Sequence, residues 1–333
     1  MVQSRSGENI AARVSTFVLF SAAVLVLLQI TSTAQTNAVH PSDSHTATTS
    51  AFLAAGMAQP LKTYHDRSIR DVGAVGNRDV GCNHGPGSQY PLEAQVEMGQ
   101  SEAQEVETTS KLITDPVITG YVNGIGQNLV RNSDAQVRFT FKIISTGDVN
   151  AFSLPGGFIF VDSGLILAAE NEAELAAVIS HEIAHVAACH AAQEMASEQV
   201  TDLASLPLIF RLVARHITRN TAYLPPARSF ESDADLLALE YLYKTGYDPW
   251  ALPAFFETAL AIQKQKPGSR DKAFEPEAQI ADRIQKTRQE INTLLPPTPE
   301  NKVDSSDFQE IKLRLAELEK QPQNALGRPR PIR

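Results

Sequence analysis

Residues 171–186 read Asn-Glu-Ala-Glu-Leu-Ala-Ala-Val-Ile-Ser-His-Glu-Ile-Ala-His-Val, and the rest of the chain is best understood from this segment. Asn171 can cap a helix, because its side-chain oxygen accepts hydrogen bonds from the first backbone amides, and Glu174 follows three residues later, as in a capping box. Apolar side chains then recur at three- and four-residue steps; they are Leu175, Val178, Ile179, Ile183 and Val186. The pattern predicts a largely buried helix that carries two histidines.

The two histidines and the glutamate that follows the first have the spacing of a metal site. On a helix, positions four apart share one face, so the rings of His181 and His185 can reach the same ion while Glu182 projects beside it. Zinc accepts neutral imidazole nitrogens and activates a bound water, whose proton a neighbouring carboxylate can take. A solvated helix face can carry the same string by chance, but burying these side chains without a metal would be costly. We therefore predict one Zn²⁺ per chain, with His181 and His185 as ligands and Glu182 as the general base.

A third protein ligand is needed, and a second predicted helix offers one. This helix runs from Glu231 to a stop at Gly246, and Glu231 and Asp235 lie four residues apart on one face. Glu231 can complete a His₂Glu site, and Asp235 can accept a hydrogen bond from the outer nitrogen of a ligating histidine. Taken alone, Glu231 is equally well explained as an ordinary acidic helix start.

Other residues near these motifs are less well supported as parts of the metal site. A metzincin needs glycine at position 188 and histidine at position 191, and both positions are alanine, which excludes that class. On a continuous helix, His190 lies about 140° around the axis from His185 and points away from the metal face. Arg228 precedes Glu231 by three residues and either stabilises an oxyanion or pairs with an acid.

The elements before the histidine helix are predicted to form a small sheet and its helical cover. Helices are expected from Leu92 and over residues 116–130, followed by strands at 137–143 and 158–161. A Pro-Gly-Gly turn precedes the second strand. In one interpretation the sheet edge at Gly156, Gly157 and Phe158 holds a substrate as an added strand; in the other it is a plain structural hairpin.

The ends of the chain differ in composition from its middle. Residues 1–34 read as a signal peptide, because Arg5 and Arg13 precede an apolar run and small residues precede Gln35. The prediction is an exported protein, periplasmic or secreted, with a single-pass membrane anchor as the alternative. The rest of the chain is predicted to comprise a flexible, turn-rich segment over 35–90, a zinc metallopeptidase domain over 91–320 and a disordered tail over 321–333.

Composition limits the classes of protein that this chain can represent. Its 333 residues, 43% of them hydrophobic, can form one large or two modest domains. The formal net charge of −9 and the lack of a Lys/Arg-rich run argue against nucleic acid as a partner. Cys82 and Cys189 are too few for a disulfide scaffold, and a single bond between them and two free thiols both remain open.

The motifs in combination resemble a known family. His-Glu-Ile-Ala-His-Val at 181–186, the segment 150–159, Glu-Ser-Asp-Ala-Asp at 231–235 and Gly-Tyr-Asp-Pro at 246–249 are similar to the HtpX and CAAX-prenyl-protease type of zinc metallopeptidase, in particular to exported, soluble bacterial members. The resemblance implies an α+β, mostly helical gluzincin (zincin-like) fold with a small β-sheet beside the histidine helix. It matches His181, His185 and Glu231 to the zinc ligands and Glu182 to the base. Cys189 is a departure, because many relatives have arginine there.

We therefore expect a zinc-dependent metalloendopeptidase that hydrolyses peptide bonds of misfolded or envelope proteins by Glu-assisted attack of zinc-bound water. Its partners would be polypeptide substrates, with envelope or membrane proteins among them. The alternative is a zinc-binding, chaperone-like or scaffold protein that holds clients without cutting them. Glu182 favours the peptidase, because a protein that only holds zinc has no use for a base next to the metal.

Overall fold

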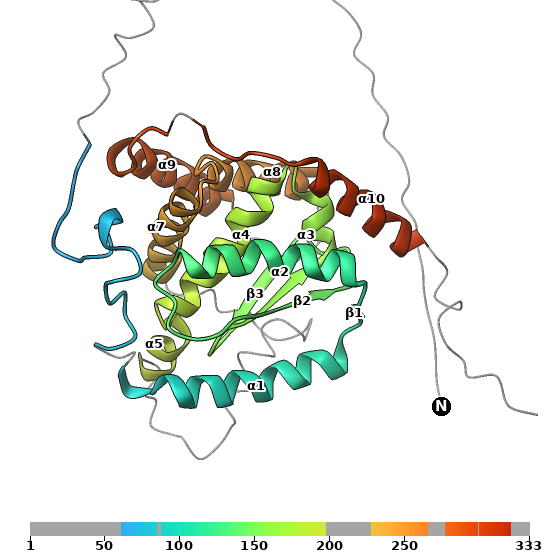
Figure 1. The fold of residues 1–333 in the computed structure, drawn as a ribbon, viewed down its shortest axis with the longest axis horizontal. Coiled ribbons are helices and arrows are strands. Elements are labelled where there is room, and N and C mark those ends of the chain that lie inside the picture. The colour runs from blue at the N-terminus through green and yellow to red at the C-terminus, as the bar shows by residue number, and fades with distance from the viewer. Residues whose placement is uncertain (1–60, 85–87, 198–227, 266–276, 299, 321–333) are drawn as a thin grey trace, which may run out of the picture. The chain divides into compact units, whose positions relative to one another are not determined.

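The computed structural model describes residues 61–84, 88–197, 228–265, 277–298 and 300–320 (Figure 1). The predicted signal peptide, the predicted tail and the part of the predicted flexible segment before residue 61 lie outside these residues. Within the described chain, the predicted α+β, mostly helical class with a small sheet is confirmed.

Helices make up most of the described chain. The α-helices are α1 (Leu92–Thr109), α2 (Pro116–Arg131), α3 (Ser163–Ala168), α4 (Glu172–Ala187), α5 (His190–Ser197), α7 (Arg228–Thr245), α8 (Ala251–Gln265), α9 (Glu277–Leu294) and α10 (Ser306–Lys320). The strands are β1 (Leu112–Ile113), β2 (Thr140–Ile144), β3 (Ala151–Leu154) and β4 (Phe158–Asp162). A 3₁₀ turn, η1 (Val72–Ala74), lies in the N-terminal segment.

The strands form one mixed sheet in the order β1-β2-β4-β3. Strand β4 is internal, because it pairs parallel with β2 and antiparallel with β3. Strand β2 begins three residues later than residue 137, because its pairing with β4 starts at Thr140 opposite Phe158. Strand β3 was not predicted as a separate strand, since it is short and buried on both faces and therefore shows no alternation of polarity.

Different helices cover the two faces of the sheet. Ile159 and Val161 of β4 contribute to the main core, which α2 and α4 share, whereas Phe160 belongs to a smaller cluster under α1. Strand β3 follows the same alternation. Its Phe152 packs in the cluster under α1, and its Ser153 contacts α4 on the opposite face. The sheet therefore presents one side of its edge strand to the histidine helix.

Helix α4 begins as the sequence predicted. The side-chain oxygen of Asn171 accepts a hydrogen bond from the backbone N–H of Glu174 at 3.0 Å. The Glu174 carboxylate in turn accepts from the backbone N–H of Glu170 at 3.0 Å, which satisfies a second free donor at the helix start. The helix is almost entirely buried, so the predicted core helix is confirmed.

Helix α7 is the main packing partner of α4. The hydroxyl of Ser180 donates to the backbone carbonyl of Ala238 at 3.1 Å, a buried link between the two helices. Residues three and four positions from Ser180 are the fully buried alanines Ala177 and Ala184, and α7 contributes the fully buried Ala234 beside Ala238. Small side chains allow the two helix axes to approach closely.

Among the described residues, no single helix is long and apolar enough to cross a membrane. The bent pair α4 and α5, with a break of 46°, meets the same criteria by length and composition. Helix α4 is the buried core helix of this domain.

A buried arginine anchors residues 61–84 to the domain. The side chain of Arg78 has no exposure, and its guanidinium pairs with Asp134 at 2.9 Å and with Glu240 on α7. The hydroxyl of Tyr241 also donates to Asp134, at 3.0 Å. The described part of the segment predicted to be flexible is rich in turns, and it is held against α7 by buried charges.

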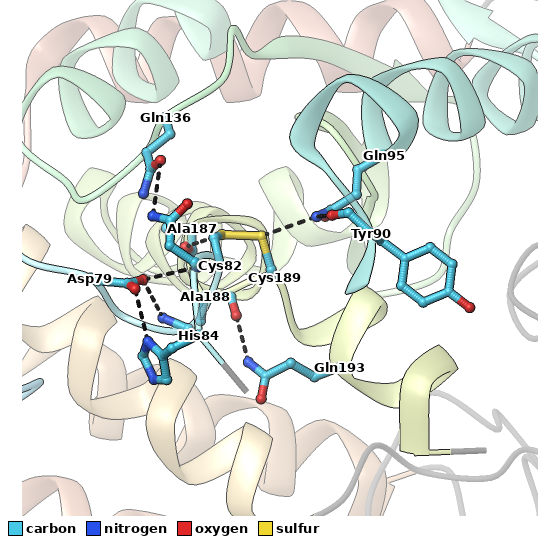
Figure 2. The surroundings of a disulfide bond; sticks show 12 residues. Asp79, Cys82, His84, Tyr90, Gln95, Gln136, Ala187, Ala188, Cys189 and Gln193 are labelled. Carbon is cyan, nitrogen blue, oxygen red and sulfur yellow. Dashed lines mark hydrogen bonds and ion pairs between the residues drawn. A yellow bond between two sulfur atoms is a disulfide. The ribbon is translucent and has the colours of Figure 1, made fainter. Parts of the chain in front are cut away.

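A disulfide joins the same segment to the end of α4. Cys82 is bonded to Cys189, 107 residues later in the chain, and both residues are buried (Figure 2). This finding decides between the two alternatives that the sequence left open. The N-terminal segment is therefore attached to the domain twice, once through Arg78 and once covalently.

Replacing Arg78 with methionine should destabilise the fold strongly, because Asp134 and Glu240 would remain as buried carboxylates without a counter-charge. We expect Arg78→Met to lower the free energy of unfolding by about 3–5 kcal/mol, as measured by chemical denaturation. The matched control is Arg288→Met. Arg288 pairs with Glu257 at the surface, where 47% and 51% of the two side chains are exposed, and its loss should cost less than about 1 kcal/mol. Equal losses in the two variants would contradict this account.

Candidate metal centre

Three potential metal ligands from two helices meet in one cluster. His181 and His185 come from α4 and Glu231 from the first turn of α7, and one donor atom of each lies within 4.8 Å of the others. Nε2 of His181 lies 3.0 Å from Nε2 of His185 and 3.4 Å from one oxygen of Glu231, and Nε2 of His185 lies 3.6 Å from the other oxygen. Around a tetrahedral zinc with ligands at about 2.0–2.1 Å, neighbouring donors are about 3.3 Å apart. The spacing of these three side chains, called the donor triangle below, therefore fits zinc.

Glu182 lies beside these ligands, and the sheet holds its carboxylate. The hydroxyl of Ser153, on β3, donates to Oε2 of Glu182 at 2.8 Å. Burial raises the pKa of Glu182 to about 7, against the opposing influence of His181. Ser153 was not predicted to belong to the site. A polar residue within a short apolar stretch was the only signal, and no spacing rule connects that stretch to α4.

Two further charged residues surround the ligands. Nδ1 of His181, the nitrogen that faces away from the other donors, lies 3.1 Å from Asp235, although without the alignment of a regular hydrogen bond. Arg283 on α9 donates to both oxygens of Asp235, at 2.6 and 2.8 Å, and lies 3.3 Å from Glu231. Asp235 thus lies beside the outer nitrogen of His181. Arg283 was not predicted, because it lies 48 residues beyond Asp235 and no local pattern connects the two.

The carboxylates make this cluster favourable for positive charge. Burial alone would lower the pKa of His181, but Asp235 and Glu231 outweigh it and raise the pKa to about 10. Burial lowers the pKa of His185 to about 4, despite the opposing charge of Glu231. Burial would raise the pKa of Glu231, but the close contact with His181 and the charge of His185 hold that pKa well below its usual range. A metal cation at this place would be stabilised by the same carboxylates.

The structure corrects the expectation for His190. This residue was predicted to point away from the metal face, yet its Nδ1 lies 3.0 Å from Nδ1 of His185. The prediction assumed one continuous helix. In the structure α4 ends at Ala187, Cys189 has a left-handed backbone with φ of 53°, and α5 leaves at an angle of 46°. The break turns His190 back toward the site, where burial lowers its pKa well below the usual range.

The predicted substrate-binding residues at the Pro-Gly-Gly turn do not reach the cleft. A Cβ atom on Gly156 would lie 2.4 Å from Cα of Val96 on α1, and one on Gly157 would lie 2.3 Å from a backbone oxygen, so the turn is packed against the protein. The backbone of Phe158 pairs with strands on both sides. None of these three residues lines the cleft, and the edge strand that does line it is β3.

The candidate metal ligands lie in a cleft with an apolar wall. Strand β3 and its flanks, residues 150–155, line one side, and helices α8 and α9 line the other. The apolar side chains on the helical side are Leu252, Phe255, Phe256, Ala259 and Ile280. Arg228, the first residue of α7, is exposed and is not among the described residues that line this cleft, so the oxyanion role considered for it has no support from the geometry.

This fold and this site define the class of a metallopeptidase: a buried His-Glu-x-x-His helix, a second helix that brings a carboxylate to it and a sheet edge beside both. The family follows from comparison of sequences. The model described as Peptidase family M48 matches residues 116–291, more than half of the chain, and the chain belongs to that family. The resemblance to HtpX-type peptidases is therefore confirmed at the level of the family.

Individual relatives agree with this assignment. The beta-barrel assembly-enhancing protease of Escherichia coli (strain K12) is 31% identical over 190 residues, which are 52% of this chain and 39% of that protein. The protein of the same name from Yersinia pestis is 28% identical over 270 residues, 74% and 53% of the two chains. The mitochondrial metalloendopeptidase OMA1 of Schizosaccharomyces pombe is 29% identical over 183 residues, 49% and 54%. The chain thus spans only 39–54% of the length of these relatives.

Removing the carboxylate next to His181 should weaken zinc binding. We expect Asp235→Asn to lower the zinc affinity by about 10- to 100-fold, because such outer partners fix the orientation of a ligating histidine. Competition with a chromophoric chelator measures the affinity. Asp233→Asn is the matched control, since it makes the same change in the same helical turn, at a carboxylate that faces Lys286 and Arg70 instead. Equal affinities of the two variants would contradict a role for Asp235 at the metal.

Proposed function

We propose that this protein is a zinc-dependent metalloendopeptidase in which His181, His185 and Glu231 hold one Zn²⁺ and Glu182 is the general base. The observation that carries the proposal is the spacing within the donor triangle. The two Nε2 atoms lie 3.0 Å apart, and the two oxygens of Glu231 lie 3.4 Å from Nε2 of His181 and 3.6 Å from Nε2 of His185, which suits a tetrahedral zinc. The carboxylate of Glu182 lies next to this triangle. Membership of peptidase family M48 and the metalloendopeptidase relatives support the same reading.

Different residues of the site have different roles in the proposed hydrolysis. When bound, zinc would polarise a substrate carbonyl as a Lewis acid and lower the pKa of water. Glu182 would accept the proton of the attacking water and return it to the leaving amine. Ser153 keeps that carboxylate in one orientation through its 2.8 Å hydrogen bond. Asp235 and Arg283 hold His181 and Glu231, so the donors are in place before metal or substrate arrives.

The edge of β3 is the place proposed for the substrate backbone. The carbonyl of Asn150 accepts from the N–H of Asp162 at 3.0 Å, so the backbone groups of residues 150, 152 and 154 face β4. Those of Ala151 and Ser153 then face away from β4. Residues 150–155 line the cleft, so a peptide in it can pair with Ala151 and Ser153 as an added strand.

We infer that the substrates are polypeptides, and misfolded or envelope proteins in particular. The names of the bacterial relatives connect those proteins with β-barrel assembly. The Cys82–Cys189 disulfide supports export to an oxidising compartment such as the periplasm, because disulfides are rare where thiols are kept reduced. This agrees with the predicted signal peptide.

Replacing the proposed base should abolish proteolysis without loss of metal. We expect Glu182→Gln to degrade an unfolded protein, such as reduced and carboxymethylated lactalbumin, about 10²- to 10⁴-fold more slowly than the unmodified chain at equal zinc content. Gel electrophoresis and metal analysis measure the two quantities. Glu170→Gln, an exposed residue ahead of α4, is the control and should cut at the normal rate. Cleavage by Glu182→Gln at the normal rate would reject the assignment, and zinc-loaded protein that never cuts would favour client holding.

Pairing of the substrate with β3 predicts sensitivity to N-methylation of the peptide backbone. In a series of otherwise identical peptide substrates, each with one N-methyl group, positions opposite Ala151 and Ser153 should lose about 2- to 10-fold in kcat/KM. That loss corresponds to one hydrogen bond of about 0.5–1.5 kcal/mol. The expected profile alternates with a period of two, because only every second amide of an added strand faces the sheet. A profile without alternation would argue against strand addition.

A further inference from the structure

His190 makes a contact with the proposed metal centre that the proposed mechanism does not use. Its Nδ1 lies 3.0 Å from Nδ1 of His185, and the two rings meet edge to face with centroids 5.0 Å apart. His190 is only 4% exposed. It therefore occupies the same position relative to His185 that Asp235 occupies relative to His181.

The direction of this hydrogen bond follows from the geometry of the ligands. Nε2 of His185 is the atom that faces His181 and Glu231, so it is the atom available to a metal. A neutral imidazole that gives Nε2 to a metal carries its hydrogen on Nδ1. His185 is then the donor and Nδ1 of His190 the acceptor. The contact would fix both the tautomer and the ring orientation of His185.

A ring contact and the preceding residue both fix the position of His190. Its ring stacks on Phe230, with centroids 4.7 Å apart and an angle of 20° between the planes. Phe230 immediately precedes Glu231, so the stack connects His190 to the helix that carries the third ligand. In the sequence His190 directly follows Cys189, whose left-handed backbone produces the turn between α4 and α5.

The disulfide lies at the turn between α4 and α5, and other residues also contact the backbone or sulfur atoms of that turn (Figure 2). Sγ of Cys82 lies 3.1 Å from the carbonyl oxygen of Ala187, and Gln95 of α1 donates to Sγ of Cys189 at 3.4 Å. Gln193 donates to the carbonyl of Ala188 at 2.7 Å. A non-glycine residue in a left-handed conformation persists only where its surroundings impose it, and here a covalent bond is part of those surroundings.

We propose that His190 is a positioning residue for the metal ligand His185, and that the Cys82–Cys189 disulfide holds His190 there, so that zinc retention depends on a covalent bond to the N-terminal segment. The proposal rests on the proposed function, because it assumes zinc at the donor triangle. It adds a residue and a bond that control how well the metal is held.

The first test separates the polar contact of His190 from its packing. His190→Phe keeps an aromatic ring for Phe230 but removes the acceptor, and we expect it to lower zinc affinity by about 10- to 100-fold. His190→Asn keeps a polar atom near the position of Nδ1 and should restore most of that loss. Chelator competition gives the affinity, and the visible spectrum of the Co²⁺-loaded protein reports ligand geometry. His84→Phe, at a side chain that is 66% exposed, is the control and should match the unmodified protein.

The second test removes the disulfide. The double variant Cys82→Ser, Cys189→Ser leaves His181, His185 and Glu231 untouched, and we expect it to lose zinc affinity in the same direction as His190→Phe and to change the Co²⁺ spectrum. Adding His190→Phe to the double variant should cause little further loss, because the two changes act through one contact. Thermal unfolding of the metal-free proteins shows whether each variant is folded.

The outcomes separate this proposal from the proposed function. If the unmodified protein binds no zinc, the proposed function fails. If it binds zinc and His190→Phe binds equally well with an unchanged Co²⁺ spectrum, only the role of His190 is overturned. If His190→Phe loses zinc but the double cysteine variant does not, the role of the disulfide is overturned. Loss in both, with rescue by His190→Asn, supports the whole proposal.

Discussion

Helices α4 and α7 each contribute donors to the proposed metal site, and their packing sets the distances between those donors. Two ligands from one helix cannot complete a zinc site, because positions four apart on α4 supply only two of the four coordination positions. The third ligand must come from a helix whose axis approaches closely. Buried alanines and the hydrogen bond from Ser180 to Ala238 allow that approach. The remaining elements can be understood as supports for this pair.

The supports differ from one ligand to the next. His181 faces a carboxylate that Arg283 holds from α9, whereas His185 faces a second imidazole that is stacked on Phe230. Glu182 is held from the sheet by Ser153. Each support belongs to a different part of the chain, so the geometry of the site reflects the assembly of the whole domain. A cluster built this way can hold its donors near the spacing of a bound metal, because Arg283 fixes Asp235 and Glu231 in place while their combined charge still favours a cation.

The N-terminal segment belongs to this assembly. Arg78 is inserted between Asp134 and Glu240, and Glu240 lies on the same helix as Glu231. Cys82 is bonded to the residue that ends the histidine helix. A segment that looks like a turn-rich linker in the sequence is therefore attached to both helices that form the site. The segment contacts Cys189, just after α4, through Cys82 and contacts α7 through Arg78.

The sequence by itself determined the parts of this protein that depend on local spacing. The cap at Asn171, the apolar face of α4 and the pairs His181 with His185 and Glu231 with Asp235 follow from the period of a helix, which is a local property. The mixed α+β class followed as well. Only the tertiary structure decided what depends on elements distant in sequence: the free edge at β3 in place of Gly156, Gly157 and Phe158, the contacts of Ser153 and Arg283, and the pairing of the two cysteines. His190 shows the reason most directly, since one left-handed residue at Cys189 breaks the helical period from which its direction was predicted.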